Sequence, residues 1–307
     1  MHNNQKTNRR EFVKTTATLA SAVGVSSVIC QNTAATEKVN STIQIEGRQT
    51  RKVVTNASGQ LYVAVDNSVA IYNRQGTQLA KHDFTKPVRA LHAFENGQML
   101  VGFINSVALV NADGKTTKTV SAFDKASVLS EIAVHDEGIM ISDSGTQVVW
   151  QLNSELEILG SIDLDSKVQT PASQLKIMVV KDQLHVVNSR RHRIDIYSLA
   201  GVKLGSWGKK SRDPAGFSGC CNPVGLAVTA DGTFITAERS QPRIKQFDQK
   251  GQFIAQIMGP DAFPENAKAS ENDNGLGCNT GGFDLAVDTQ GRVIVLDLAT
   301  NRLHIVA

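Results

Sequence analysis

The sequence predicts an all-β fold, a six-bladed β-propeller whose ring is closed by an N-terminal strand. Three observations support this prediction. One unit recurs six times after residue 50, each copy contains short β-branched runs bounded by Asn, Asp and Gly, and no 3.6-residue helical period is visible. Four strands in roughly 40 to 60 residues is the size of a propeller blade.

The first 35 residues have the layout of an export signal. Residues 1–14 are polar and basic, residues 15–29 are small and weakly apolar, and residues 31–35 offer a small-residue cleavage site. A membrane anchor is disfavoured, because about 15 apolar residues fall short of the roughly 20 that span a bilayer. Lipidation at Cys30 is disfavoured too, since Ile29 stands where a small residue is usual.

The run NRREFVK resembles the twin-arginine export signature through Arg9, Arg10, Phe12 and Lys14. This resemblance implies that the chain is exported already folded, often with a cofactor installed, into the periplasm or another extracytoplasmic space. The membrane would then be a partner only during export. Residues 36–307 are predicted to form one propeller domain.

The charge of the mature chain argues against nucleic-acid binding. The whole sequence has 32 basic and 29 acidic residues, and the first 35 residues hold four of the basic and one of the acidic residues, which leaves 28 of each. A nucleic-acid binder needs a clustered basic surface to neutralise phosphates. Aromatic residues make up only 5% of the chain and form no series on which bases could stack.

Strand pairs joined by Gly-bearing turns recur along the rest of the chain. The aligned middle portions of the six units begin at Ser58, Asn96, Glu137, Asp182, Asp231 and Gln290. The sixth unit ends at Ala307 after only three strands, which would leave an open sheet edge. Residues 41–45 (STIQI) are the expected donor of the missing outer strand.

The phrases GLAVTADG from Gly225 and DLAVDTQG from Asp284 resemble those of NHL-repeat propellers. The resemblance covers about residues 50–307 and is clearest in the last three units. It implies a propeller from a family that includes binding platforms and a few lyases and hydrolases, and the fold alone does not choose among these functions.

Two connections are long, residues 206–222 between the fourth and fifth blades and residues 259–282 between the fifth and sixth. Long loops inside a compact domain are usually functional or disordered. The first carries Cys220 and Cys221, and the second carries Cys278. Because successive strands alternate in direction, both loops are expected on one face of the ring, together with the loops between second and third strands.

Those second-to-third-strand loops bring polar residues to the same face, namely Arg190, His192, Arg193, Glu238 and Arg243. A cationic surrounding lowers the pKa of thiols and makes them better ligands or nucleophiles. The arginines could also bind a small anionic ligand or another exported protein. The GCCNP motif with these flanking residues resembles exported bacterial NHL-like proteins of unassigned role.

Three interpretations of the cysteines stay open. Cys278 could form a disulfide with Cys220 or Cys221 that ties a loop down. The three thiolates, with His192 or Glu238, could bind copper, zinc or an iron–sulfur cluster. Cys220 and Cys221 could also form a vicinal disulfide that exchanges with partners. We therefore expect an exported NHL-like binding module with a metal, iron–sulfur or redox site on its loop face.

One alternative is a propeller lyase or hydrolase that uses a cation in the central channel, and another is a plain interaction scaffold. Asp143, Asp297 and Glu238 end second strands where a carboxylate could hold such a cation, although turn capping is the simpler role. Isolated histidines are interpreted as structural, namely His82, His92, His135, His185 and His304. No G-x-S-x-G, H-E-x-x-H or phosphate-binding motif occurs.

Overall fold

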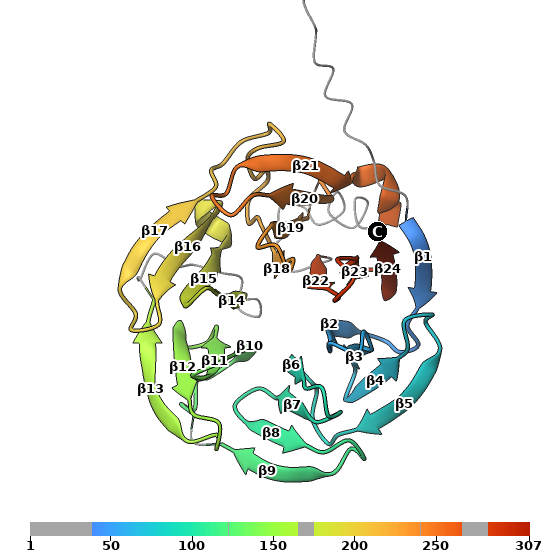
Figure 1. Cartoon of the computed structure of the whole chain (residues 1–307), viewed down its shortest axis with the longest axis vertical. Coiled ribbons are helices and arrows are strands. Elements are labelled where there is room, and N and C mark those ends of the chain that lie inside the picture. The colour runs from blue at the N-terminus through green and yellow to red at the C-terminus, as the bar shows by residue number, and fades with distance from the viewer. Residues whose placement is uncertain (1–38, 122, 165–174, 240, 266–281) are drawn as a thin grey trace, which may run out of the picture. The chain divides into compact units, whose positions relative to one another are not determined.

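The computed structural model describes residues 39–121, 123–164, 175–239, 241–265 and 282–307. Within these residues, six antiparallel sheets of four strands each are arranged as a ring around a central axis (Figure 1). Contacts divide the chain into residues 1–33 and residues 34–307, and every described residue belongs to the second unit. In the described segments, no helix has the length and apolar character needed to cross a membrane. The predicted export signal lies outside the described residues.

Each of the first three blades consists of four strands consecutive in the chain, numbered from the channel outwards. The first contains β2 (Thr50–Thr55), β3 (Leu61–Val65), β4 (Ser68–Tyr72) and β5 (Gln78–Asp83). The second contains β6 (Ala90–Ala93), β7 (Met99–Gly102), β8 (Val107–Val110) and β9 (Thr116–Val120). The third contains β10 (Leu129–His135), β11 (Gly138–Asp143), β12 (Val148–Leu152) and β13 (Ile158–Asp163).

The fourth blade contains β14 (Ile177–Val180), β15 (Gln183–Asn188), β16 (Arg193–Ser198) and β17 (Lys203–Trp207). A short 3-10 helix, η1 (Ser189–Arg191), joins β15 to β16. The fifth contains β18 (Gly225–Val228), β19 (Phe234–Glu238), β20 (Arg243–Phe247) and β21 (Phe253–Met258), followed by η2 (Pro260–Ala262). The sixth contains β22 (Phe283–Val287), β23 (Val293–Asp297) and β24 (Arg302–Val306).

The outer strand of the sixth blade is β1 (Val39–Gln44), which confirms the predicted ring closure. It pairs antiparallel with β24, so that Ile43 lies opposite Leu303. The Thr42 hydroxyl lies 3.3 Å from His304 Nδ1 across this seam. The two ends of the domain are thereby joined in one sheet, and Figure 1 shows β1 beside β24.

The core consists of apolar layers between neighbouring blades. β3, β7, β11, β19 and β23 are buried along their whole length, which is why they read as β-branched and apolar runs. The outer strands are more exposed than the strands inside them, and each carries a β-bulge where it pairs with the third strand of its blade.

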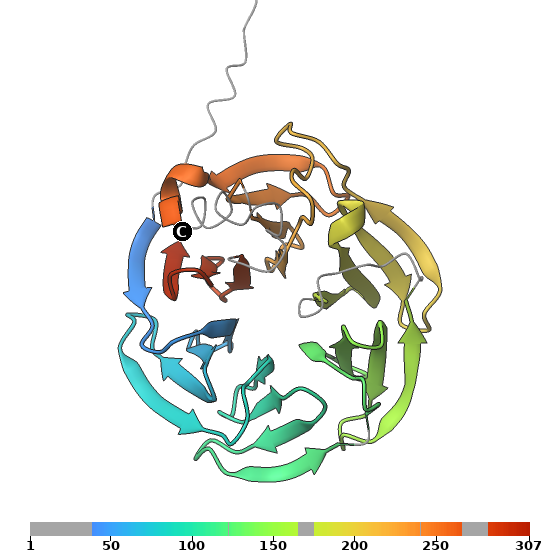
Figure 2. The ribbon, with the colours of Figure 1, turned by 180° about the vertical axis from the view of Figure 1, so that it is seen from behind.

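The ring has two faces, seen in Figures 1 and 2. Connections between blades and those between second and third strands share one face, which we call the long-loop face. The turns joining first to second and third to fourth strands occupy the other, which we call the hairpin face. The two predicted long connections are observed as residues 208–224 and 259–282. A third, residues 164–176, joins β13 to β14 and was not expected to be long.

Candidate functional site

Cys220 and Cys221 lie on the 208–224 connection, just before the inner strand β18 of the fifth blade. Their sulfur atoms are 3.4 Å apart. Cys220 is exposed, whereas Cys221 is only 5% exposed. Cys278 lies outside the described residues, so its place beside these thiols stays a prediction.

His192 fixes the backbone next to this pair. It ends the 3-10 helix η1 in the left-handed region, at φ 56°, and is buried. Its Nε2 lies 2.9 Å from the Gly219 carbonyl oxygen. A carbonyl can only accept, so Nε2 carries the proton and donates it. This nitrogen is therefore occupied by a loop contact and does not face a metal ion.

Glu238, the last residue of β19, is a fully buried carboxylate that anchors the same loop. It accepts a hydrogen bond from the Ser218 backbone N–H at 2.7 Å. Arg243 Nε lies 2.7 Å from Glu238 Oε2, and Lys245 Nζ lies 3.0 Å from the same oxygen. The carboxylate is thus occupied by two cations rather than open to a metal ion.

Lys245 anchors an earlier part of the same loop. Its ammonium group donates to the carbonyl oxygens of Gly216, at 2.6 Å, and Pro214, at 3.1 Å. It also lies 4.5 Å from the centre of the Phe217 ring. Burial lowers the pKa of Lys245 to about 8, even though the Glu238 carboxylate acts in the opposite direction. This buried lysine, absent from the sequence-based site, holds the turn that precedes the cysteines.

Asn222, the residue after the cysteines in the GCCNP motif, holds the cysteine loop in place. Its side chain is fully buried and donates to the carbonyl oxygens of Ser218, at 2.6 Å, and Arg239, at 2.9 Å. In return the Arg239 N–H donates to Asn222 Oδ1 at 2.9 Å. These bonds join the loop to the β19–β20 connection.

The five supporting residues predicted from the sequence therefore divide into two groups. His192, Glu238 and Arg243 contact the cysteine loop, and Arg243 Nη2 also lies 3.0 Å from the Ser218 hydroxyl. Arg193 instead pairs with the buried Asp195 at 2.9 Å, and Arg190 is exposed on η1. The charge of Arg243 is balanced by Glu238, so it acts mainly as part of the loop anchor.

The carboxylates proposed for a channel cation have other partners. Asp143 accepts hydrogen bonds from the Val128, Gly145 and Thr146 N–H groups and from the Trp150 indole. Asp297 accepts from the Ala299 N–H at 2.8 Å. Both therefore cap turns. Across the described ranges, no three His, Cys, Asp or Glu side chains are grouped so that they could hold a metal ion.

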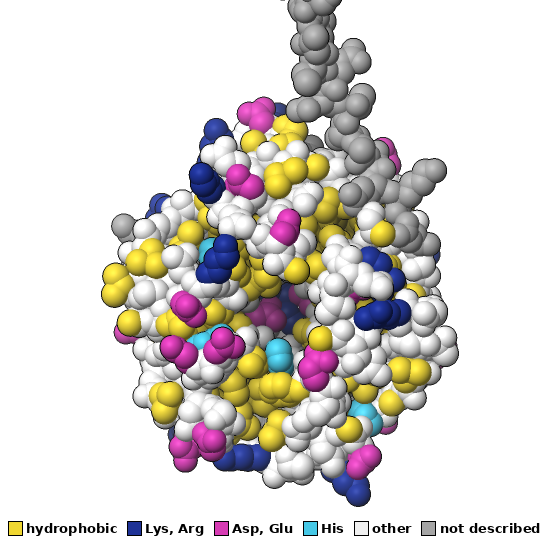
Figure 3. Space-filling model, in the orientation of Figure 1, with side chains coloured by type: hydrophobic (Ala, Val, Ile, Leu, Met, Phe, Trp, Pro, Cys, Tyr) yellow, Lys and Arg dark blue, Asp and Glu magenta, His cyan; other side chains and the backbone are white. Residues whose placement is uncertain are grey.

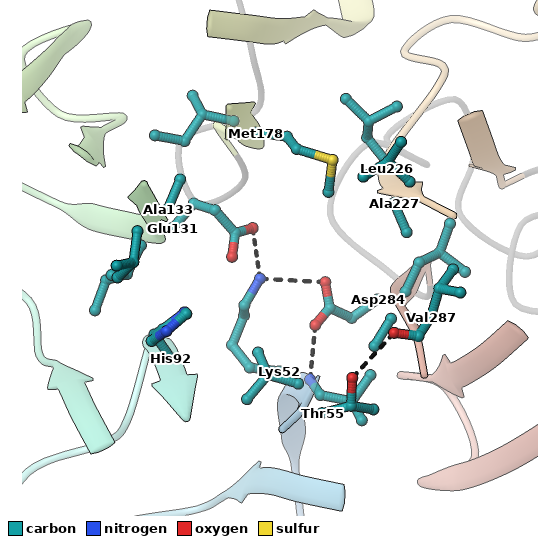
Figure 4. Close-up of a pocket in the computed structure, with 18 of the residues that line it drawn as sticks. Lys52, Thr55, His92, Glu131, Ala133, Met178, Leu226, Ala227, Asp284 and Val287 are labelled. Atoms are coloured by element: carbon teal, nitrogen blue, oxygen red, sulfur yellow. Dashed lines mark hydrogen bonds and ion pairs between the residues drawn. The ribbon is translucent and has the colours of Figure 1, made fainter. Parts of the chain in front are cut away.

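The channel instead contains a buried cluster of four charges from four different blades. Lys52 Nζ on β2 lies 2.5 Å from Glu131 on β10 and 3.2 Å from Asp284 on β22 (Figure 4). Lys176, just before β14, pairs with Asp284 and lies 3.3 Å from Glu131. Asp284 also accepts the Val53 N–H at 2.7 Å, which ties the sixth blade to the first.

Burial and pairing compete in this cluster. Burial alone would raise the pKa of Asp284, but Lys176 and Lys52 outweigh it and hold that pKa below its usual value. Burial lowers the pKa of Lys52, and Asp284 and Glu131 offset only part of this effect. For Lys176 the same two carboxylates outweigh burial and raise its pKa. Lys176 and Asp284 each stand between apolar neighbours, whereas Lys52 and Glu131 follow the polar residues Arg51 and Ser130. Sequence reasoning missed all four because nothing in these local sequences indicates that the side chains meet in the channel.

Comparison with solved structures shows the propeller fold. A protein of unknown function from Bacteroides caccae is 12% identical, with a TM-score of 0.55, over 71% of this chain and 85% of that chain. An inactive variant of virginiamycin B lyase from Staphylococcus aureus, solved with quinupristin, is 12% identical, with a TM-score of 0.57, over 86% and 82%.

A streptogramin B lyase structure is 9% identical, with a TM-score of 0.58, over 87% of this chain and 96% of that chain. No protein-family model matches the sequence, and no curated protein matches it. At these identities the similarity defines the architecture and leaves the chemistry to the residues of this chain. The chain therefore has the fold of a six-bladed propeller, with lyases among its structural neighbours.

Proposed function

We propose that this protein is an exported propeller binding module that captures a soft metal ion through the thiols of Cys220 and Cys221 on its long-loop face. The observation that carries the proposal is the 3.4 Å separation of the two sulfur atoms on a loop anchored by buried side chains. Glu238, Arg243 and Lys245 would contribute rigidity, because a site must be held in place before the ion arrives.

The donor set favours copper(I) over the other candidate metals. His192 Nε2 and the Glu238 carboxylate are engaged within the protein, so the proposal rests on the sulfur ligands. Structural zinc usually takes four ligands and an iron–sulfur cluster usually takes four cysteines. Only three cysteines follow the predicted signal. Soft thiolates select copper(I), with Cys278 as the expected third ligand.

Elemental analysis of the exported protein, purified without oxygen, tests the proposal. We expect one copper per chain in the wild type and loss of that copper in Cys220→Ser, Cys221→Ser and Cys278→Ser. Ser58→Ala, which deletes an exposed hydroxyl on the hairpin face, is the matched control and should keep the metal.

The export prediction has its own test. Changing Arg9 and Arg10 to Lys should hold the protein in the cytoplasm if the twin-arginine prediction is correct.

Two results would contradict metal capture. Metal-free protein with a Cys278 disulfide would indicate an interaction scaffold. Metal-free protein whose Cys220 and Cys221 interconvert between thiol and disulfide in a glutathione buffer would indicate the redox version instead. Mass spectrometry after alkylation distinguishes these two results.

A further inference from the structure

A pocket of about 270 Å³ lies in the central channel, away from the cysteine loop. Its lining runs from Lys52 to Thr55 on β2, from Glu131 to Val134 on β10, and from Asp284 to Val287 on β22, with further residues of β6, β14 and β18. These are the later parts of the inner strands, next to the turns of the hairpin face. The space-filling view shows the corresponding central hollow, with acidic and basic side chains at its bottom (Figure 3).

The charge cluster forms the floor of this pocket. Lys52 and Lys176 balance Glu131 and Asp284, so the floor has no net charge when all four groups are ionised. Both lysines contact the same oxygen of Glu131, Oε2. In the described part of the chain, Glu131 Oε1 receives no hydrogen bond, and the Glu131 side chain is 12% exposed. Lys52 uses two of its three N–H donors on carboxylates.

The side chains of the wall above the floor are mostly apolar. Met178, Leu226, Ala227 and Val287 contribute to it from three blades (Figure 4). His92 of β6 also lines the pocket and packs edge-on against Phe94, with ring centres 4.8 Å apart. Burial lowers the pKa of His92 to about 4, so the imidazole is neutral near pH 7. Mostly apolar side chains together with a small number of polar ones are typical of small-molecule sites.

We infer that this pocket binds a small uncharged organic molecule whose apolar body packs against the wall and whose polar head both donates a hydrogen bond to Glu131 and accepts one from Lys52. A primary amide is such a head. The site is independent of the proposed metal function, because it lies at the hairpin end of the channel, whereas the cysteine loop belongs to the long-loop face.

The balanced floor is the reason for preferring an uncharged ligand. A carboxylate or an ammonium head would add an unpaired charge to a largely buried site, and burying an unpaired charge is costly. A ligand that supplies one donor and one acceptor satisfies the floor without disturbing the ion pairs. The pocket volume lies just below the range of drug-sized sites, which suits a molecule of the size of benzamide.

Benzamide, benzoate and benzylammonium have similar size and differ in charge, so they are suitable probes. Ligand-detected NMR titrations at neutral pH should show that wild-type protein binds benzamide about tenfold more tightly than either ion. Glu131→Gln gives the floor one net positive charge and should reverse the preference in favour of benzoate. Glu137→Gln, the same substitution at an exposed position on the hairpin face, should leave the wild-type order unchanged.

Ala133→Leu gives a second variant that keeps all four charges and fills part of the pocket, so benzamide binding should weaken at least about tenfold. Thermal unfolding will show whether Glu131→Gln folds, and if it does not, Ala133→Leu provides the test. The inference is wrong if no probe binds the wild type at millimolar concentration, if an ion binds it more tightly than benzamide, or if Ala133→Leu binds benzamide as the wild type does. Copper content should be the same in every variant, so failure here leaves the metal proposal standing.

Discussion

Glu238 is a buried residue that stabilises two parts of the structure at once, the β19–β20 pair and the cysteine loop. It joins the ends of β19 and β20 to the cysteine loop through Ser218, Arg243 and Lys245. Glu238 was predicted as a metal ligand and Arg243 as part of a site for an anionic partner. The structure pairs them with each other, because an ion buried in a protein is stabilised mainly by a nearby opposite charge.

Replacing Glu238 with Gln should therefore destabilise the protein by about 3–5 kcal/mol, because Arg243 and Lys245 would remain buried without their carboxylate. Denaturant unfolding measures this loss, and alkylation of Cys220 and Cys221 should become faster as the loop loosens. Glu137→Gln, on an exposed turn, should change stability by less than about 0.5 kcal/mol. Equal stability of the two variants would contradict the anchoring role of Glu238.

Buried histidines should make stability depend on pH. Burial lowers the pKa of His185 from 6.5 to about 4. Between these values the unfolded chain binds a proton that the folded chain does not, so stability falls as pH falls from about 6.5 towards 4. At about pH 5 the loss from His185 should reach about 2 kcal/mol relative to neutral pH.

Urea unfolding at neutral pH and at about pH 5 measures this dependence. His185→Leu should be less sensitive to acid than the wild type by about that amount. The side chain packs against Phe234, with ring centres 4.9 Å apart, so the variant loses a contact at every pH and only the change with pH is diagnostic. An unchanged pH dependence would show that His185 titrates normally in the folded protein.

At the scale of the elements, the outer strands depart most from simple strand patterns. In four blades the extra residue of the outer-strand bulge is an exposed aliphatic side chain, and these residues are Leu79, Leu159, Leu204 and Ile254. A shift of one residue in register moves a side chain to the opposite face of a strand. Sequence alternation alone therefore could not assign these residues to the surface. The bulges also bend the outer edges, which disfavours pairing with other chains.

The turn between β4 and β5 in the first blade packs against the closing strand β1. Gly76 has φ +84°, and a Cβ there would lie 2.7 Å from Ile43 Cδ1 on β1. Gly291 has a similar φ, +80°, but a Cβ would meet no described heavy atom within 4 Å. Gly291→Ala should cost about 1–2 kcal/mol for the left-handed backbone.

Gly76→Ala should cost about 1–3 kcal/mol more than Gly291→Ala, because Ile43 must also move. Thermal unfolding of the two variants isolates this packing contribution. Equal shifts of Tm would mean that Ile43 can move without loss of stability and that β1 is loosely packed against the turn.

At the scale of the molecule, the ring depends on the pairing of β1 with β24. Ile45, just after β1, is 1% exposed, and its burial alone contributes about 1.5–3 kcal/mol. Removing residues 1–46 should lower Tm, expose the edge of β24 and cause self-association, as measured by thermal unfolding and light scattering. Removing residues 1–35 is the control and should leave Tm and the number of chains per particle unchanged. Equal behaviour of the two truncations would show that the closing strand is dispensable.

The repeated strand–turn pattern was sufficient to predict six blades and the closing strand, because alternating burial and turn chemistry are local properties of the chain. The same reasoning placed Cys220 and Cys221 on the long-loop face. Their ordered frame could not be foreseen, since Lys245 and Asn222 act through contacts between different loops. The charge cluster in the channel could not be predicted either, because its four residues come from four blades, namely Lys52, Glu131, Lys176 and Asp284. Only closure of the ring brings such isolated charges together, and pairing is what makes their burial tolerable.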